Sequence, residues 1–102
     1  DIFPVQYGHT LVVPKIEVDK FFDVPNEYLG NLLLFAKPIA HAIEKAFNCN
    51  RVNIITVGLE VPHAHVHLLA TNTMYDVDLS KPKLKLSASE LKETQEKILA
   101  HL

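Results

Sequence analysis

The stretch VPHAHVHLLA, residues 61–70, places three histidines at every second position of an otherwise apolar run. Side chains of a β-strand alternate between two faces, so this run predicts a strand whose apolar side chains face a core. His63, His65 and His67 then share the opposite face, where neighbours are roughly 7 Å apart at a rise of about 3.3 Å per residue. The three imidazoles are therefore expected to form one polar site.

Two more strands are predicted around this run. RVNIITV, residues 51–57, is apolar and β-branched, and the turn signal Gly58 after it predicts an antiparallel hairpin with residues 61–70. GHTLVVP, residues 8–14, predicts a further strand that ends at a proline. His9 stands at its start, and it completes a cluster of four histidines if the two strands pair closely.

Two helices are predicted as well. Apolar side chains recur at helical spacing over residues 29–47, and Asp23 is placed to cap this helix. Pro38 lacks the N–H that would bond within the helix, so it predicts a kink or a break. Ser87 and Glu90 form a capping box ahead of an amphipathic C-terminal helix. The order of the elements predicts an α+β fold, with an antiparallel sheet and helices against one face.

The composition restricts the class of partner. A chain of 102 residues, 48% of them hydrophobic, corresponds to a single domain with a real core. Its formal charge of −2 and the absence of a basic tract argue against nucleic-acid and membrane binding and favour a small soluble partner. No apolar run reaches the roughly 18 residues of a membrane span, no signal peptide is recognisable, and the lone Cys49 allows no internal disulfide. We expect a cytoplasmic protein.

Three interpretations of the histidines compete. A solvated strand face is the weakest, because such faces usually carry Thr, Lys, Glu and Ser. A metal site is the second, since neutral imidazole is a common zinc ligand, although alternating residues fan out along a strand and Glu60 is the only carboxylate nearby in sequence. Phosphate chemistry is the third: one imidazole attacks phosphorus and its neighbours donate hydrogen bonds. The spacing alone favours metal and phosphate equally.

The segment HAHVHLL resembles the signature of the histidine triad (HIT) family, in which three histidines alternate with apolar residues. The upstream segment DIFPVQYGHTLVVPK is similar to the family's Asp-hydrophobic pair, which is followed by Pro and by a His that leads a strand. This resemblance covers residues 1 to about 70 and implies the HIT-like fold. It also implies roughly thirty residues before Asp1, so that residues 1–102 would be a single HIT-like domain that is N-terminally incomplete.

The resemblance implies a role for each histidine. His65 would be the nucleophile that takes a nucleoside monophosphate from the α-phosphorus of the substrate and yields it to water. His67 would contact the phosphate oxygens and the leaving-group bridge, while His63 and His9 would orient the ring of the nucleophile. Phosphate chemistry thereby becomes the leading hypothesis, with no cofactor and no resident metal.

The same resemblance implies the substrate and the assembly. Asp1 would bind the ribose hydroxyls, a pairing that suits a carboxylate, and Ile2 would lie against the base. The substrate would be a purine nucleotide, either a nucleoside phosphoramidate or a dinucleoside polyphosphate. The protein would be a homodimer joined through the long helix and the neighbouring strand. A nucleotide-binding regulatory module with little turnover and a histidine-based metal-binding protein remain the alternatives.

The chain departs from the family just before the triad. Where the family often has Gly-Gln-Ser or Gly-Gln-Thr, this sequence has Gly58, Leu59 and Glu60. Leu59 has no hydrogen-bond donor, and Glu60, which we place beside the nucleotide, would repel phosphate when ionised. These residues are expected to set the substrate and the rate. The lysines of KPKLKL, residues 81–86, are interpreted as a solvated strand in preference to a site for a leaving-group anion.

Overall fold

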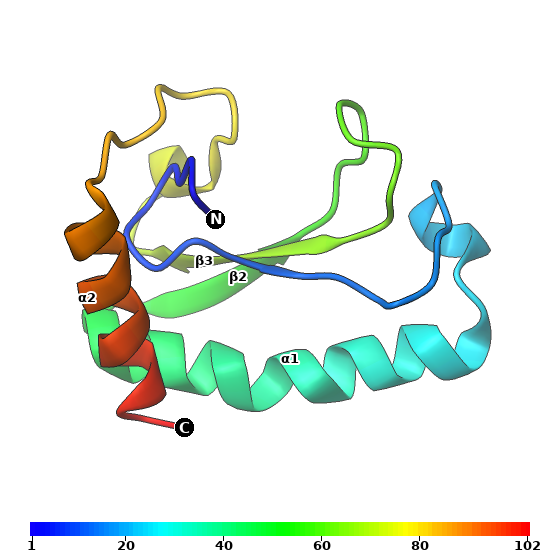
Figure 1. Ribbon diagram of the computed structural model, residues 1–102, viewed down its shortest axis with the longest axis horizontal. Helices are drawn as coiled ribbons and strands as arrows, with labels where there is room; N and C mark the ends of the chain where they lie inside the picture. The colour runs from blue at the N-terminus through cyan, green and yellow to red at the C-terminus, as the bar shows by residue number, and fades with distance from the viewer.

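The computed structural model describes all residues from Asp1 to Leu102 and has an α+β architecture (Figure 1). The predicted fold class is confirmed: an antiparallel sheet carries a long helix, and a second helix follows at the C-terminal end. The elements along the chain are β1 (Thr10–Val12), a 3-10 turn η1 (Phe21–Asp23), α1 (Asn26–Phe47), β2 (Arg51–Ile55), β3 (Val66–Thr71), a second 3-10 turn η2 (Met74–Val77) and α2 (Ala88–Leu99).

The three strands form one sheet with β3 in the centre. Both neighbours run antiparallel to it, in the order β1, β3, β2. His67 lies opposite Leu11 of β1 and opposite Ile55 of β2. The predicted hairpin of β2 and β3 is therefore confirmed, and so is the pairing that brings the start of β1 toward the histidines.

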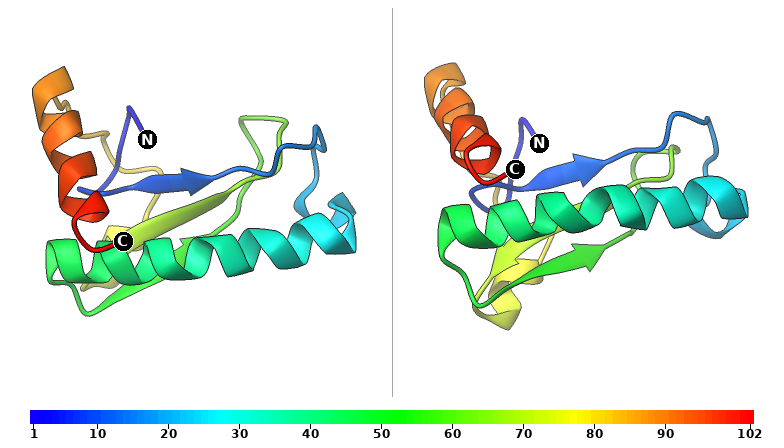
Figure 2. Two further views of the ribbon diagram at one scale, coloured as in Figure 1. Left: turned by 60° about the horizontal axis from the view of Figure 1, so that its bottom comes forward. Right: turned by 90° about the horizontal axis from the view of Figure 1, so that it is seen from below.

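The main core lies between the sheet and α1, which runs along one face of the sheet while α2 lies across one end of the molecule (Figure 2). Seven buried apolar side chains from β1, α1 and β3 make up this core: Val12, Leu32, Ala36, Ile43, Val66, Leu68 and Ala70. Removing such side chains from water is the main stabilising contribution to a fold of this kind. The alternation of β3 therefore directs Val66 and Leu68 toward α1, as the sequence predicts.

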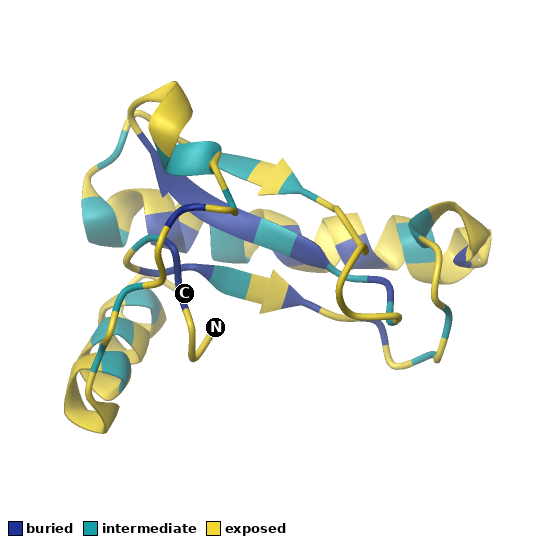
Figure 3. Cartoon of the chain, turned by 90° about the horizontal axis from the view of Figure 1, so that it is seen from above, coloured by how far each residue is buried: buried dark blue, intermediate teal, exposed yellow.

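The face of the sheet opposite to α1 carries His67. The N-terminal segment, η2 and the segment before α2 all lie on this side (Figure 1), and Figure 3 shows it from above with the buried central strand. Leu69, which shares a face with His67, is fully buried, and Pro4 and Val5 of the N-terminal segment are buried too. This face is therefore only partly open to solvent.

The strand predicted over residues 61–70 begins later, at Val66. His63 and His65 precede it because the partners end: β1 stops at Val12 and β2 stops at Ile55. The strands predicted over residues 8–14 and 51–57 are also shorter than expected, and they span Thr10–Val12 and Arg51–Ile55.

The segment that carries His63 and His65 is held by other contacts. The N–H of Ala64 donates to the carbonyl of Val18 at 2.7 Å. Ala64 and Val66 are buried while His65 is half-buried, so the alternation of faces persists where the strand itself does not.

Two details of the helix prediction are wrong. Asp23 does not cap α1 but lies in η1, and the N-cap residue is Pro25. Of the kink or break predicted at Pro38, the break is wrong, since the helix continues from Asn26 to Phe47. Pro38 and Leu34 are both exposed, so the Leu34 carbonyl that loses its helical partner is on the side that meets water.

The C-terminal helix α2 begins as predicted. The Ser87 hydroxyl accepts a hydrogen bond from the N–H of Glu90 at 3.2 Å, and the Glu90 carboxylate accepts one from the N–H of Ser87 at 3.1 Å. This reciprocal pair satisfies two backbone donors that a helix start leaves free. Neither α1 nor α2 combines the length and apolarity that crossing a membrane requires.

Candidate active site

Three histidine rings, those of His9, His65 and His67, meet at one end of the β1–β3 pair. The ring centroids of His9 and His67 are 5.1 Å apart, and those of His65 and His67 are 4.8 Å apart. His63 joins them through its main chain, since its carbonyl oxygen lies 2.6 Å from Nδ1 of His65. The structure thus brings together the rings of His9, His65 and His67, while His63 contributes its main chain.

The contact of His65 fixes its tautomer. A carbonyl oxygen can only accept, so the proton of the His65 ring is on Nδ1, which donates to the His63 carbonyl. Nε2 then carries a free lone pair, as a nucleophile requires. The hydroxyl of Thr56 donates to the carbonyl of His65 at 2.8 Å and holds the main chain of this residue.

The tautomers of His9 and His67 follow from a chain of hydrogen bonds that starts at the main chain. The N–H of Val5 donates to Nδ1 of His9 at 3.1 Å, so the ring proton of His9 is on Nε2. That Nε2–H donates to Nδ1 of His67 at 2.9 Å. His67 accordingly carries its own proton on Nε2, where it is available as a donor.

Burial keeps both of these rings neutral. Desolvation, followed by the charge of His67 and then by the N-terminus, Lys83 and Lys81, lowers the pKa of His9 to about 3. Desolvation is also the largest cause that lowers the pKa of His67, followed by the charge of His65 and by Lys83. A pair of neutral imidazoles is what the hydrogen-bond chain needs, because Nδ1 of each ring must be free to accept.

The contacts of His63 differ from what the family resemblance implies. Its ring Nε2–H donates to the carbonyl of Pro14 at 3.1 Å. The group that orients the His65 ring is therefore the main-chain carbonyl of His63 rather than its imidazole. His9 reaches His65 only through His67.

The imidazoles are spread over separate partners, and no three His, Cys, Asp or Glu side chains are arranged to hold a metal ion. His63 is tied to Pro14, His65 to the His63 carbonyl, and His9 to His67. The metal-site interpretation finds no matching donor set in this geometry.

Two residues expected to bind the nucleoside lie beside the cluster. Asp1 directs Oδ2 to within 3.8 Å of Nε2 of His9, and its Oδ1 accepts from the N–H of Phe3 at 2.8 Å. Ile2 is 68% exposed.

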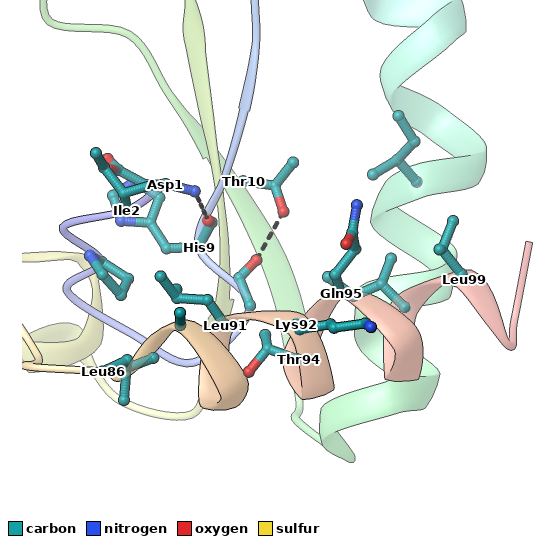
Figure 4. A pocket seen from close by; sticks show the side chains of 15 residues that line it. Asp1, Ile2, His9, Thr10, Leu86, Leu91, Lys92, Thr94, Gln95 and Leu99 are labelled. Atoms are coloured by element: carbon teal, nitrogen blue, oxygen red, sulfur yellow. Dashed lines mark hydrogen bonds and ion pairs between the residues drawn. The ribbon is translucent and has the colours of Figure 1, made fainter.

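A cavity of about 550 Å³ opens next to these residues, between the N-terminal segment, β1 and α2 (Figure 4). Asp1, Ile2 and His9 line it together with apolar side chains of α2. The other three histidines do not line this cavity.

The turn before the triad is open to solvent. Gly58 has φ of +70°, a conformation that glycine adopts without strain. Leu59 is 88% exposed, and Glu60 is exposed with no side-chain hydrogen bond. Glu60 is not among the charges that shift the pKa of His9 or His67.

Sequence reasoning missed several contributors to the cluster. Val5 and Pro14 act through backbone atoms, which no side-chain pattern reveals. Thr56 gave a weak signal as a hydroxyl at the end of a strand beside the triad. Lys83 is exposed, as the sequence suggests, but the sequence gives no sign that its charge acts on both His9 and His67.

The HIT domain family matches residues 1–74, which include the four histidines, β1, α1 and the hairpin. The chain belongs to the HIT family. The order of the triad histidines on and before β3 is therefore the family signature, as the resemblance indicated.

Members of the HIT family resemble the chain in sequence and in structure. It is 36% identical to an adenosine 5′-monophosphoramidase of Saccharomyces cerevisiae over 68% of this chain and 44% of the relative. It is 32% identical to an asymmetrical bis(5′-nucleosyl)-tetraphosphatase of Schizosaccharomyces pombe over 65% of this chain and 39% of the relative. A solved HIT-like protein from Bartonella henselae superposes with a TM-score of 0.82 at 26% identity and covers 100% of this chain and 76% of its own. The chain thus spans less than half the length of these two curated relatives.

Proposed function

We propose that this HIT-family protein is a nucleotide hydrolase or transferase that acts through a covalent nucleotidyl intermediate on His65. The observation that carries the proposal is the 2.6 Å contact between Nδ1 of His65 and the carbonyl of His63, because it leaves the Nε2 lone pair free. The substrates would be nucleoside phosphoramidates or dinucleoside polyphosphates. The activities named for the relatives in the two yeasts support this class.

The proposed reaction has two displacements. In the first, Nε2 of His65 forms a bond to the α-phosphorus, and the bond from phosphorus to the leaving group breaks with its electron pair; an amine leaving group takes up a proton from solvent as it departs. In the second, water attacks the same phosphorus, the P–Nε2 bond breaks, and a proton of the water is released to solvent. The intermediate ring is cationic, with phosphorus on one nitrogen and hydrogen on the other, so the His63 carbonyl stabilises it.

His67 assists the same reaction from its Nε2–H. Because Nδ1 of His67 accepts from His9, the outward nitrogen is held as a donor. It would donate to a phosphate oxygen or to the bridging atom as negative charge develops there. Asp1 and Ile2 would hold the ribose and the base, which the approach of the Asp1 carboxylate to His9 supports.

A homodimer is part of this proposal. Apolar side chains of α1 stay exposed in the single chain, with Leu34 at 70% and Phe35 at 65%. On β2, whose outer edge has no partner strand, Ile54 is 49% exposed. A second copy would cover both elements. Analytical ultracentrifugation of the unsubstituted protein and of the Leu34→Lys variant tests this, because the variant should shift toward monomer.

The nucleotidyl intermediate is tested by mass spectrometry of a quenched reaction. With adenosine phosphoramidate or a dinucleoside polyphosphate, the peptide that contains His65 should gain the mass of a nucleoside monophosphate. His65→Ala should lose both the adduct and the turnover, while its circular dichroism stays unchanged. His101→Ala is the matched control, because His101 is exposed at the C-terminal end and should leave both intact.

A nucleotide-binding module with little turnover is the second candidate. The exposed Leu59, which offers no donor to the leaving group, favours it. Tight nucleotide binding without adduct or turnover would support the module and contradict the hydrolase. Stoichiometric metal in the purified protein, with activity lost to a chelator, would contradict both.

A further inference from the structure

Lys83 lies in the segment between η2 and α2, on the side of the sheet that carries His67 (Figure 1). The residues around it are fixed to the N-terminal segment. The N–H of Leu84 donates to the carbonyl of Pro4 at 2.7 Å. The ammonium of Lys81, itself only 8% exposed, donates to the side-chain oxygen of Gln6. The main chain of Lys83 is therefore held in place from both sides.

The same N-terminal segment supports the histidine cluster. Gln6 donates from Nε2 to the carbonyl of Ala70 in β3 at 3.2 Å, and Val5 donates to His9, which in turn donates to His67. Lys83 is thus anchored to the few residues that position the catalytic rings. Its location beside them is a property of the fold rather than of a free loop.

Lys81 and Lys83 differ in the partners of their ammonium groups. The Lys81 ammonium is bonded to Gln6 and lies 4.8 Å from the centroid of the Tyr75 ring. The Lys83 ammonium donates only to the carbonyl of Leu79, at 3.3 Å, and has no carboxylate within ion-pair distance. An ammonium has three donors, so Lys83 keeps donors for an incoming anion.

The charge of Lys83 acts at the cluster. It contributes to lowering the pKa of both His9 and His67, after desolvation as the largest cause. Lys85, two residues later and also exposed, contributes to neither. Lys83 is the only lysine whose charge lowers the pKa of His67. The turn before the triad, with Leu59 and Glu60, contains no cationic side chain that could bind a phosphate.

We propose that Lys83 binds the phosphate chain of the nucleotide beyond the reacting phosphorus and so favours substrates with two or more phosphates. This inference rests on the proposed function, since it assumes that a nucleotide phosphate lies at His65 and His67. A substrate whose leaving group is an amine carries less negative charge and gains little from this cation. Lys83 would therefore decide between the two substrate classes.

The test is equilibrium binding of ADP and AMP by calorimetry at low salt. Lys83→Ala should weaken the binding of ADP about fivefold, the upper range for one exposed ion pair, and that of AMP less than twofold. Lys83→Arg should restore the affinity for ADP, and Lys85→Ala, the matched control, should change neither. An equal loss for both nucleotides, no loss, or a loss in Lys85→Ala of the same size would overturn the proposal, as would an unsubstituted protein that does not bind ADP.

The outcome is separable from that of the proposed function. Discrimination between ADP and AMP through Lys83 needs no turnover, whereas the covalent mechanism is judged by the adduct on His65. If the adduct is absent but Lys83→Ala still weakens ADP selectively, the hydrolase fails and this inference stands.

Discussion

Nε2 of His9 lies 2.9 Å from Nδ1 of His67, and this contact determines which nitrogen of His67 carries its proton. The tautomer of His9 is itself determined by the main chain, because the N–H of Val5 donates to its Nδ1. A protonated His9 could not accept from Val5, so the arrangement requires a neutral ring. The low pKa of His9 and the geometry of the site are thus two consequences of the same burial.

Stability should fall in mild acid through His9. The folded protein lowers the pKa of His9 to about 3 from the ordinary value of 6.5, so between these values the unfolded chain binds more protons. This loss of stability is small above pH 6.5 and grows as the pH falls. It should lower the free energy of unfolding by about 2 kcal/mol between pH 7 and pH 5. Urea unfolding at both pH values measures it, and His9→Gln should flatten the dependence. An equal pH dependence in both proteins would contradict this account.

Gly8 should not tolerate a side chain. Its φ is +79°, and an added Cβ would come within 2.9 Å of Cδ2 of Phe47 and closer still to Cε2. Gly8→Ala should therefore lower the free energy of unfolding by about 2–3 kcal/mol, as overpacking and backbone strain add. Gly30→Ala is the matched control at an exposed position of α1, where the new Cβ meets nothing within 4 Å beyond its own helix backbone, and it should stabilise by about 0.5–1 kcal/mol. Thermal unfolding that ranks the two variants in the opposite order would refute the argument.

The capping box should stabilise α2. Ser87→Ala removes the acceptor of the Glu90 N–H and should cost about 1 kcal/mol. Ser89→Ala removes only the contact of the exposed Ser89 hydroxyl with that of Ser87, leaves the hydrogen bond from the Glu90 N–H in place, and should cost less than half as much. Chemical denaturation of both variants gives the comparison, and equal losses would mean that the cap contributes nothing.

Leu59 should limit the rate of the proposed reaction. Replacing this exposed side chain with glutamine adds a donor beside the triad, and one hydrogen bond made to the leaving group should raise kcat/KM about fivefold. Val61→Gln is the control, since Val61 is also exposed in the same turn but lies outside the positions where the family places its donors. Steady-state kinetics on a dinucleoside polyphosphate measure both, and an unchanged or lower kcat/KM in Leu59→Gln would count against the idea.

The sequence alone predicted what depends on local periodicity. The alternation in residues 61–70, the helical spacing in residues 29–47 and the capping box at Ser87 each follow from contacts over a few residues, and all three are found in the fold. The errors also have local causes. Asp23 carries a general signal for a cap, but it is taken up in the 3-10 turn η1 ahead of α1. Pro38 carries a general signal for a break, but it lies on the exposed side of α1 and the helix continues through it.

The tertiary structure alone decided how the histidines can act. The hydrogen-bonded residues His9 and His67 are 58 positions apart in the sequence, His63 and Pro14 are 49 apart, and Lys81 and Gln6 are 75 apart. Several of these contacts involve backbone atoms, which every residue has and which therefore leave no mark in the sequence. The sequence thus determined that three histidines alternate with apolar residues, of which His67 lies on β3 while His63 and His65 precede it. Only the pairing of β1 with β3 and the N-terminal segment beside it decided which nitrogen of His9 and of His67 carries the proton and which cation lies near, because these proton positions follow from hydrogen-bond partners that folding alone brings together.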